Sequence, residues 1–171
     1  IYIYNGSSTG LSTTPSAEHS GDSINSFSSF GHDVASAGDI NGDGFGDIIV
    51  AAPADNPDGQ PLHSPRKVYV YFGSSPGIDL LNYWSVEGTP DNASLRLEKG
   101  IGTAGDVNGD GFSDIFIRSF NYDGVAENAE IWCFYGSSSG LPASPSWSSA
   151  AISPGSFYRS AAAGGDINGD G

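Results

Sequence analysis

The chain has 171 residues, and its 20 acidic and 6 basic residues give a formal net charge of −14. So acidic a surface repels phosphate groups, which argues against nucleic acids and anionic membranes as partners and favours cations. No apolar segment approaches the length of a membrane span, so we expect no membrane insertion.

The composition favours an all-β fold. Glycine (25 residues) and proline (10 residues) separate short apolar runs rich in Ile, Val, Tyr and Phe, as turns separate strands. One of these runs holds Cys133, the only cysteine, so an internal disulfide is excluded and a buried structural thiol is expected. The length is enough to bury a core without a disulfide scaffold.

The first predicted strand is Ile1–Tyr4, and the motif Gly-Ser-Ser-x-Gly-(Leu/Ile) follows it from Gly6. The motif returns at Gly73 and Gly136, and the strand before it returns at 68–71. Recurrence of a strand and a turn at a long spacing is typical of a repeated structural unit. Because the chain starts inside a strand, we expect its first unit to be incomplete.

An Asp-rich loop follows at 39–47, with oxygen-bearing side chains at positions 1, 3, 5 and 9 and glycine at position 6. A short loop around a hard cation points alternate side chains inward, needs glycine at its sharp bend, and uses the carbonyl at position 7 as a further ligand. The loop is therefore predicted to bind Ca2+ through Asp39, Asn41, Asp43, the Phe45 carbonyl and Asp47.

Four strands are predicted after this loop. They cover 45–52, 68–72, 83–87 and, with a weaker pattern, 95–104. Prolines within 53–66 exclude a central strand there and indicate a loop. Four antiparallel strands per unit match the blade of a β-propeller.

The Asp-rich loop occurs twice more. Its motif Gly-Asp-(Ile/Val)-Asn-Gly-Asp-Gly begins at Gly38, Gly105 and Gly165, at spacings of 67 and 60 residues. The second loop, 106–114, repeats every ligand position, whereas the third stops before position 7. The further predicted ligands are Asp106, Asn108, Asp110, the Phe112 carbonyl and Asp114, then Asp166, Asn168 and Asp170 in the third loop. We thus expect two complete calcium sites and a third, partial one.

The repeats predict one partial propeller over 1–171. It divides into an incomplete blade and lead-in (1–38), two repeats with complete loops (39–105 and 106–165) and a truncated third loop (166–171). Strands of the second repeat are predicted at 115–117, 130–135, near Trp147 and at 157–163. The chain thus holds about two and a half blades, whereas closed propellers have about 4 to 8. Because open sheet edges pair with other strands, either the chain is part of a longer protein or several copies complete one another.

Other interpretations of the Asp-rich loop fit less well. An EF-hand needs a glutamate at position 12, where this chain has Val50 and Ile117. The β-rich sequence after each loop disfavours a helical dockerin-like site, and Mg2+ prefers fewer protein ligands and more retained water. Asp-Gly and Asn-Gly clusters also form simple tight turns between strands, and that alternative stays open.

The segment from Phe30-Gly31 through the first Asp-rich loop to Ala51-Ala52-Pro53 resembles the FG-GAP repeat of integrin α-subunit propellers. The resemblance covers nearly the whole chain, although the second unit has Leu97-Glu98 and Arg118-Ser119-Phe120 in place of the flanking elements. It implies a calcium-stabilised propeller of seven or eight blades, as in adhesion receptors, lectins and accessory modules of some polysaccharide lyases and phospholipases. The fold by itself does not decide among these roles.

We therefore expect a noncatalytic, calcium-stabilised module for binding, adhesion or assembly, located outside the cell or at its surface. The expected partners are a protein or glycan ligand, or other copies of the chain that complete its blades. The alternatives are an accessory module of a secreted polysaccharide-active enzyme and a lectin, with Trp84, Trp147 and Tyr122 as candidates for stacking on sugars. Catalysis is not expected, because the sequence pairs no nucleophile with any of its histidines, His19, His32 and His63.

Overall fold

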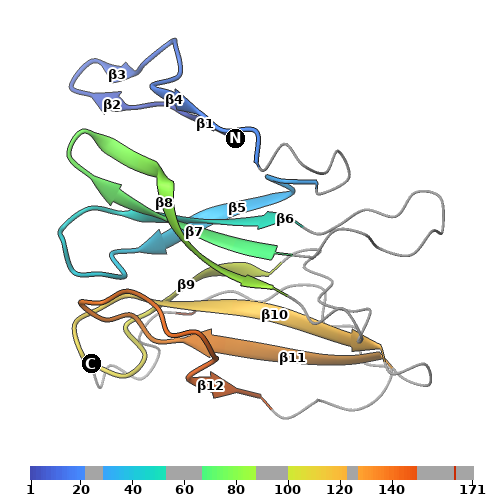
Figure 1. Cartoon of the computed structure of the whole chain (residues 1–171). Coiled ribbons are helices and arrows are strands. Elements are labelled where there is room, and N and C mark those ends of the chain that lie inside the picture. Colours follow the sequence, from blue (N-terminus) through green and yellow to red (C-terminus); the bar gives the residue numbers. More distant parts are fainter. Residues whose placement is uncertain (22–28, 53–66, 88–99, 123–126, 150–163, 165–171) are drawn as a thin grey trace, which may run out of the picture.

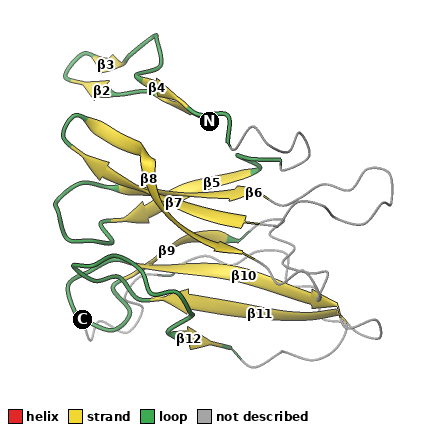
Figure 2. Cartoon of the chain, viewed as in Figure 1, coloured by secondary structure: helices red, strands yellow, loops and turns green. Residues whose placement is uncertain are grey.

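The computed structural model describes residues 1–21, 29–52, 67–87, 100–122, 127–149 and 164. Every helix or strand element in these ranges is a β-strand (Figure 2), so the all-β prediction is confirmed. Within the same ranges no helix is long and apolar enough to cross a membrane. The predicted loop at 53–66, the predicted strand at 157–163 and the third Asp-rich loop lie outside the described residues.

The first four-stranded sheet is an antiparallel meander in which each strand pairs with the next one along the chain. Its strands are β5 (Asp33–Gly38), β6 (Asp47–Ala52), β7 (Lys67–Ser74) and β8 (Gly77–Glu87). Val70 on β7 lies opposite Ile49 on β6 and Trp84 on β8, which places three apolar residues in one row across the sheet. Four strands in this order form a propeller blade.

The second four-stranded sheet repeats this topology. Its strands are β9 (Ile101–Gly105), β10 (Asp114–Tyr122), β11 (Glu127–Phe134) and β12 (Trp147–Ser148), hydrogen-bonded in that order. The prediction that 95–104 is the last strand of the first blade is therefore wrong, because residues 101–105 pair with β10. Each Asp-rich loop joins the first two strands of a blade, so the strand before the loop pairs back with the strand after it.

The N-terminal residues form the outer half of a further blade. They make two antiparallel pairs, β1 (Tyr2–Ile3) with β4 (Ala17–Glu18) and β2 (Gly6–Ser7) with β3 (Gly10–Leu11). The Gly-Ser-Ser motif aligns β1 with β7 of the first sheet, and Figure 1 shows the pairs beside that sheet. Together with the two complete sheets they amount to about two and a half blades, as predicted.

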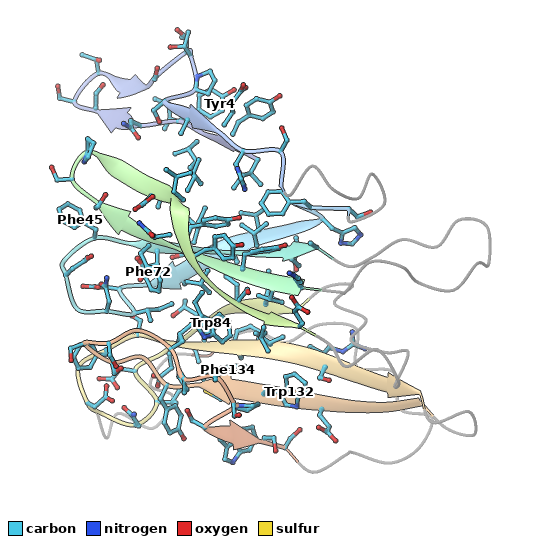
Figure 3. All side chains as sticks on the ribbon, viewed as in Figure 1. Tyr4, Phe45, Phe72, Trp84, Trp132 and Phe134 are labelled. Carbon is cyan, nitrogen blue, oxygen red and sulfur yellow. The ribbon has the colours of Figure 1, made fainter. Side chains whose placement is uncertain are left out.

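The two four-stranded sheets pack face to face on a shared apolar core. It consists of Ala37, Ile40, Ile49, Ala51, Val68, Val70, Ile101, Ile115, Ile117 and Phe134. Trp84 from β8 meets Phe134 from β11 edge to face, with ring centroids 5.0 Å apart (Figure 3). The Trp84 indole N–H also donates to the Pro142 carbonyl at 3.1 Å, so this side chain ties one blade to the next.

The first sheet is buried on its other face as well. A second cluster there contains Val50, Ala52, Tyr69 and Tyr71, packed against Ile1 and Phe30 from the N-terminal part of the chain. Burial on both faces explains why 48–52 is a continuous apolar run instead of an alternating one. The predicted strand at 45–52 starts two residues later, at Asp47, because Phe45 and Gly46 still belong to the loop.

The two complete Asp-rich loops come close because the strands that lead into them are neighbours. β5 lies beside β9, and a Cβ atom added at Gly102 of β9 would lie 3.9 Å from the Cβ of Ala35. Both loops leave their sheets at the same end, on the left of Figure 1. The fold therefore brings together two copies of a motif that are 67 residues apart in the sequence.

Candidate metal centre

The first Asp-rich loop is folded around its own side-chain oxygens. Asp39 accepts from two backbone N–H groups, with Oδ1 3.1 Å from the nitrogen of Asp43 and Oδ2 2.9 Å from that of Gly44. Asn41 Oδ1 also accepts from the Asp43 N–H at 3.1 Å, and Asp43 Oδ1 accepts from the Phe45 N–H at 2.9 Å. The side chains at positions 1, 3 and 5 thus point into the loop, as the spacing predicts.

Position 9 of the first loop is a buried carboxylate. Asp47 is only 1% exposed, and both of its oxygens accept from backbone donors. Oδ2 lies 2.8 Å from the nitrogen of Ile40, and Oδ1 lies 2.7 Å from the nitrogen of Gly73. Asp47 therefore connects the start of the loop, the beginning of β6 and the end of β7.

The second Asp-rich loop repeats this arrangement bond for bond. Asp106, Asn108, Asp110 and Asp114 accept from the equivalent N–H groups, and the Asn108 side chain donates to Asp110 as Asn41 does to Asp43. The largest difference is at the glycine donor, where the distance is 2.7 Å from Gly73 to Asp47 and 2.9 Å from Gly136 to Asp114. Two blades with different strand sequences therefore form the same set of hydrogen bonds to these oxygens.

The glycine of the Gly-Ser-Ser motif also belongs to the site, a role that was not predicted from the sequence. A Cβ atom at Gly73 would overlap the carbonyl oxygen of Gly46 and lie 2.9 Å from the Cβ of Phe45. At Gly136 it would overlap the carbonyl oxygen of Ser113 in the same way. Only glycine lets the end of β7 and the segment that follows β11 approach closely enough to donate to the buried aspartate. The signal in the sequence is that one Gly-Ser-Ser copy follows each complete Asp-rich loop.

The electrostatics of the site disfavour an uncompensated negative charge. Burial is the largest cause that raises the pKa of Asp47 above its ordinary value, and the carboxylates of Asp43 and Asp39 raise it further. The pKa of Asp114 is raised for the same reasons, with Asp110 and Asp106 as its neighbours. The backbone N–H donors oppose these effects but do not outweigh them. A nearby cation would offset this cost.

The donor set suits calcium. Every predicted ligand in the two loops is a carboxylate, amide or carbonyl oxygen, and Ca2+ prefers such hard donors. Each oxygen of Asp39 accepts one backbone N–H, which leaves a second lone pair for a cation. In the residues that the structure describes, no group of three or more His, Cys, Asp or Glu side chains is arranged as a metal cluster. The predicted ligands of the third loop, Asp166, Asn168 and Asp170, lie outside those residues.

The other residues singled out from the sequence do not gather at this site. His19 packs edge to face on Phe30 and Tyr71, with ring centroids 5.2 and 5.6 Å apart. Trp84 packs against Phe134 between the two blades, whereas Trp147 on β12 is 52% exposed. Cys133 is buried, as expected for a structural thiol. Residue 63 is not described, and neither is the side chain of residue 122.

Residues 30–71 match the family model of the FG-GAP repeat, which takes in β5, the first Asp-rich loop, β6 and most of β7. The chain is also similar to integrin α subunits. It is 32% identical to Integrin alpha-PS2 of Drosophila melanogaster over 123 residues, which are 68% of this chain and 8% of that protein.

Two vertebrate integrin subunits match longer stretches. Integrin alpha-6 of Homo sapiens is 33% identical over 138 residues, which are 80% of this chain and 11% of that protein. Integrin alpha-5 of Xenopus laevis is 30% identical over 156 residues, which are 83% of this chain and 14% of that protein. The chain thus spans only a small part of the length of these relatives. With its propeller blades and its family match, it belongs to the FG-GAP repeat family, as an integrin-type FG-GAP repeat domain.

Proposed function

We propose that the chain is a noncatalytic, calcium-stabilised module of an extracellular or cell-surface adhesion protein. The observation that carries the proposal is the duplicated loop. In both blades the equivalent side-chain oxygens, which are the predicted metal ligands, accept the same hydrogen bonds from the backbone. The first ion would be held by Asp39, Asn41, Asp43, the Phe45 carbonyl and Asp47. The second would be held by Asp106, Asn108, Asp110, the Phe112 carbonyl and Asp114, and the third loop would contribute Asp166, Asn168 and Asp170.

The ion would act on the blade through these residues. Asp39 lies directly after β5, Asp47 begins β6, and Asp47 also accepts from Gly73 on β7. A bound cation offsets the repulsion among the loop carboxylates, so it stabilises the end of the blade where three strands meet.

The proposed location and partner follow from the relatives. They are integrin α subunits, and extracellular calcium near millimolar levels is enough to fill loops of modest affinity. A protein ligand is therefore the first candidate partner. A glycan is the second, and the exposed indole of Trp147 is the observation that favours it.

The remaining blades of a closed ring have two possible sources. They come either from further repeats of a longer protein or from other copies of this chain that complete its blades. The units 39–105 and 106–165 are proposed as sequence repeats only, since each structural blade begins one strand earlier, at β5 or β9. The mass of the purified chain in solution, measured by light scattering, separates the two sources, because a monomer is expected only from the first.

Thermal unfolding with calcium and with a chelator tests the structural role of the ion. At free calcium about 100 times the dissociation constant, each filled site adds roughly 2.7 kcal/mol of stability. For a domain of this size that corresponds to an increase in Tm of about 5 to 10 °C per site. The double variant Asp43→Asn with Asp110→Asn should lose this increase, whereas Glu18→Gln, at an exposed glutamate on β4 outside the loops, should keep it. Equal melting temperatures of the unaltered chain in calcium and in chelator would rule the role out.

A further inference from the structure

We infer that the two complete Asp-rich loops bind calcium as one coupled unit, with Ser113 as the link between them. This rests on the proposed function, because it concerns how the same two loops fill. Three contacts between the loops carry it.

The first contact joins Ser113 to Asp39. Ser113 is position 8 of the second loop, and its backbone N–H donates to the carbonyl of Asp39, position 1 of the first loop, at 2.9 Å. The N–H of Asp39 donates in return to Ser113 Oγ at 3.1 Å. The first loop has Gly46 at position 8, so the hydroxyl link is special to this pair of loops. Ser113 thus holds the main chain of a predicted ligand residue on both sides.

The second contact joins Phe112 to Gly42. A Cβ atom at Gly42 would lie 2.7 Å from Cε1 of Phe112, so the aromatic ring fills the space that a side chain there would occupy. The carbonyl of Phe112 is a predicted ligand of the second loop, and Gly42 separates two predicted ligands of the first. The equivalent Phe45 is 42% exposed (Figure 3), so the described residues leave much of its ring uncovered.

The third contact joins Gly136 to Ile40. The Gly136 N–H donates to Asp114 of the second loop, and a Cβ atom added to this glycine would lie 2.7 Å from the carbonyl oxygen of Ile40. Ile40 in turn donates its N–H to Asp47 of the first loop. The buried aspartates of the two loops are therefore connected through a pair of main-chain segments that touch.

Because of these contacts, the conformation of one loop is better ordered when the other loop is ordered. Ser113 lies between Phe112 and Asp114, so filling the second loop holds Ser113 in place, and Ser113 then holds Asp39 for the first loop. The second binding event has less conformational entropy to lose, which is positive coupling. Repulsion between two dications opposes it only weakly, because three aspartates leave each filled loop with a net negative charge. Coupling between sites typically changes affinity roughly 5- to 150-fold, and we expect about tenfold here.

A calcium titration monitored by amide NMR reports on each loop separately. The N–H groups of Gly44 and Gly111 donate to the position-1 aspartates of the first and second loop, so their signals report the two sites. In the unaltered chain both signals should move with one midpoint and a Hill coefficient above one. Asp110→Asn disables the second loop, and it should raise the calcium midpoint of Gly44 about threefold, because two equal sites with about tenfold coupling share a midpoint that is lower by the square root of the coupling factor.

Ser113→Gly is the direct test of the link. It gives the second loop the residue that the first loop has at the same position and removes the hydroxyl that accepts from Asp39. We expect the Hill coefficient to fall toward one and the midpoint of Gly44 to rise, while both sites still fill, because coupling between two binding sites is reciprocal. Ser75→Gly, in an exposed turn, is the matched control and should behave as the unaltered chain does.

The outcomes distinguish a failure of the proposed function from a failure of the coupling between the loops. If neither amide responds to calcium in the unaltered chain, the proposed function fails. If both respond but the Gly44 midpoint stays the same in Ser113→Gly and in Asp110→Asn, the loops are independent and the coupling is wrong. If Asp110→Asn does not fold, Ser113→Gly decides alone.

Discussion

The backbone N–H of Gly73 donates to Oδ1 of Asp47 at 2.7 Å, and this bond joins the two motifs that alternate along the chain. Asp47 ends an Asp-rich loop, and Gly73 opens a Gly-Ser-Ser turn. Gly136 and Asp114 make the same bond at 2.9 Å in the second blade. Each blade is therefore closed at one end by a buried carboxylate that connects its second and third strands.

This relationship predicts that Gly73→Ala destabilises the fold. The added methyl group would overlap the carbonyl oxygen of Gly46, and relief of that overlap moves the Gly73 N–H away from Asp47. Overpacking of this kind costs about 1–3 kcal/mol, measurable by urea denaturation. Gly77→Ala, at a glycine with open space around it, is the control and should stay within about 0.5 kcal/mol. Equal losses in the two variants would contradict the close approach.

Asp47→Asn should destabilise the chain even in the presence of a chelator. The amide nitrogen of asparagine cannot accept, so one of the N–H groups of Ile40 and Gly73 loses its partner in a buried place. An unsatisfied buried group costs about 1–3 kcal/mol. Glu18→Gln, at an exposed glutamate on β4, should change the free energy of unfolding by less than about 0.5 kcal/mol. A neutral effect of Asp47→Asn would show that its role is ion binding alone.

Phe134→Ala should weaken the contact between the two blades. The ring of Phe134 is fully buried and meets Trp84 across the blade interface, so its removal leaves a cavity and an unsupported indole. Losses for such truncations are about 3–5 kcal/mol. Leu81→Ala on β8, where the side chain is 88% exposed, should be nearly neutral in the same denaturation experiment. A small loss at Phe134 would mean that the blades hold together without this aromatic pair.

Cys133 should react slowly with thiol reagents in the folded chain. Burial, and to a lesser extent the charge of Asp114, raises the pKa of its thiol from 9.0 to about 11. At pH 8 the thiolate fraction is then about 100-fold lower than at the ordinary value, in addition to the steric protection of a side chain that is 7% exposed. The rate should keep rising with pH beyond 9, and urea should abolish the difference from a model thiol. Rapid labelling of the folded chain at pH 8 would contradict this environment.

The local features of the fold were predictable, and the long-range ones were not. The order of apolar runs and Gly-rich turns predicted the strands, because the β6 and β7 sequences are buried on both faces and read as unbroken apolar runs. The boundary of the blade was wrong, because a repeat in sequence has no fixed starting point. Only the pairing of β9 with β10 shows that the strand before the loop belongs with the strand after it.

The candidate site also combines local features that were predictable with long-range contacts that were not. The spacing of Asp39, Asn41, Asp43 and Asp47 predicted side chains that converge in one loop, and four of the loop's own N–H groups hold them there. The donor Gly73 lies 26 residues beyond Asp47, and the link from Asp39 to Ser113 spans 74 residues. Contacts over such distances depend on how strands pair and how blades stack, and the spacing of residues within one loop does not encode them.

Isothermal titration calorimetry of the purified chain is the most direct test of calcium binding by the Asp-rich loops. We expect saturable binding of at least two calcium ions per chain. The stoichiometry should fall by at least one ion in Asp43→Asn and again when Asp110→Asn is added, while Glu18→Gln, outside the loops, changes nothing. Absence of binding at millimolar calcium, or binding that survives both loop substitutions unchanged, would contradict this expectation.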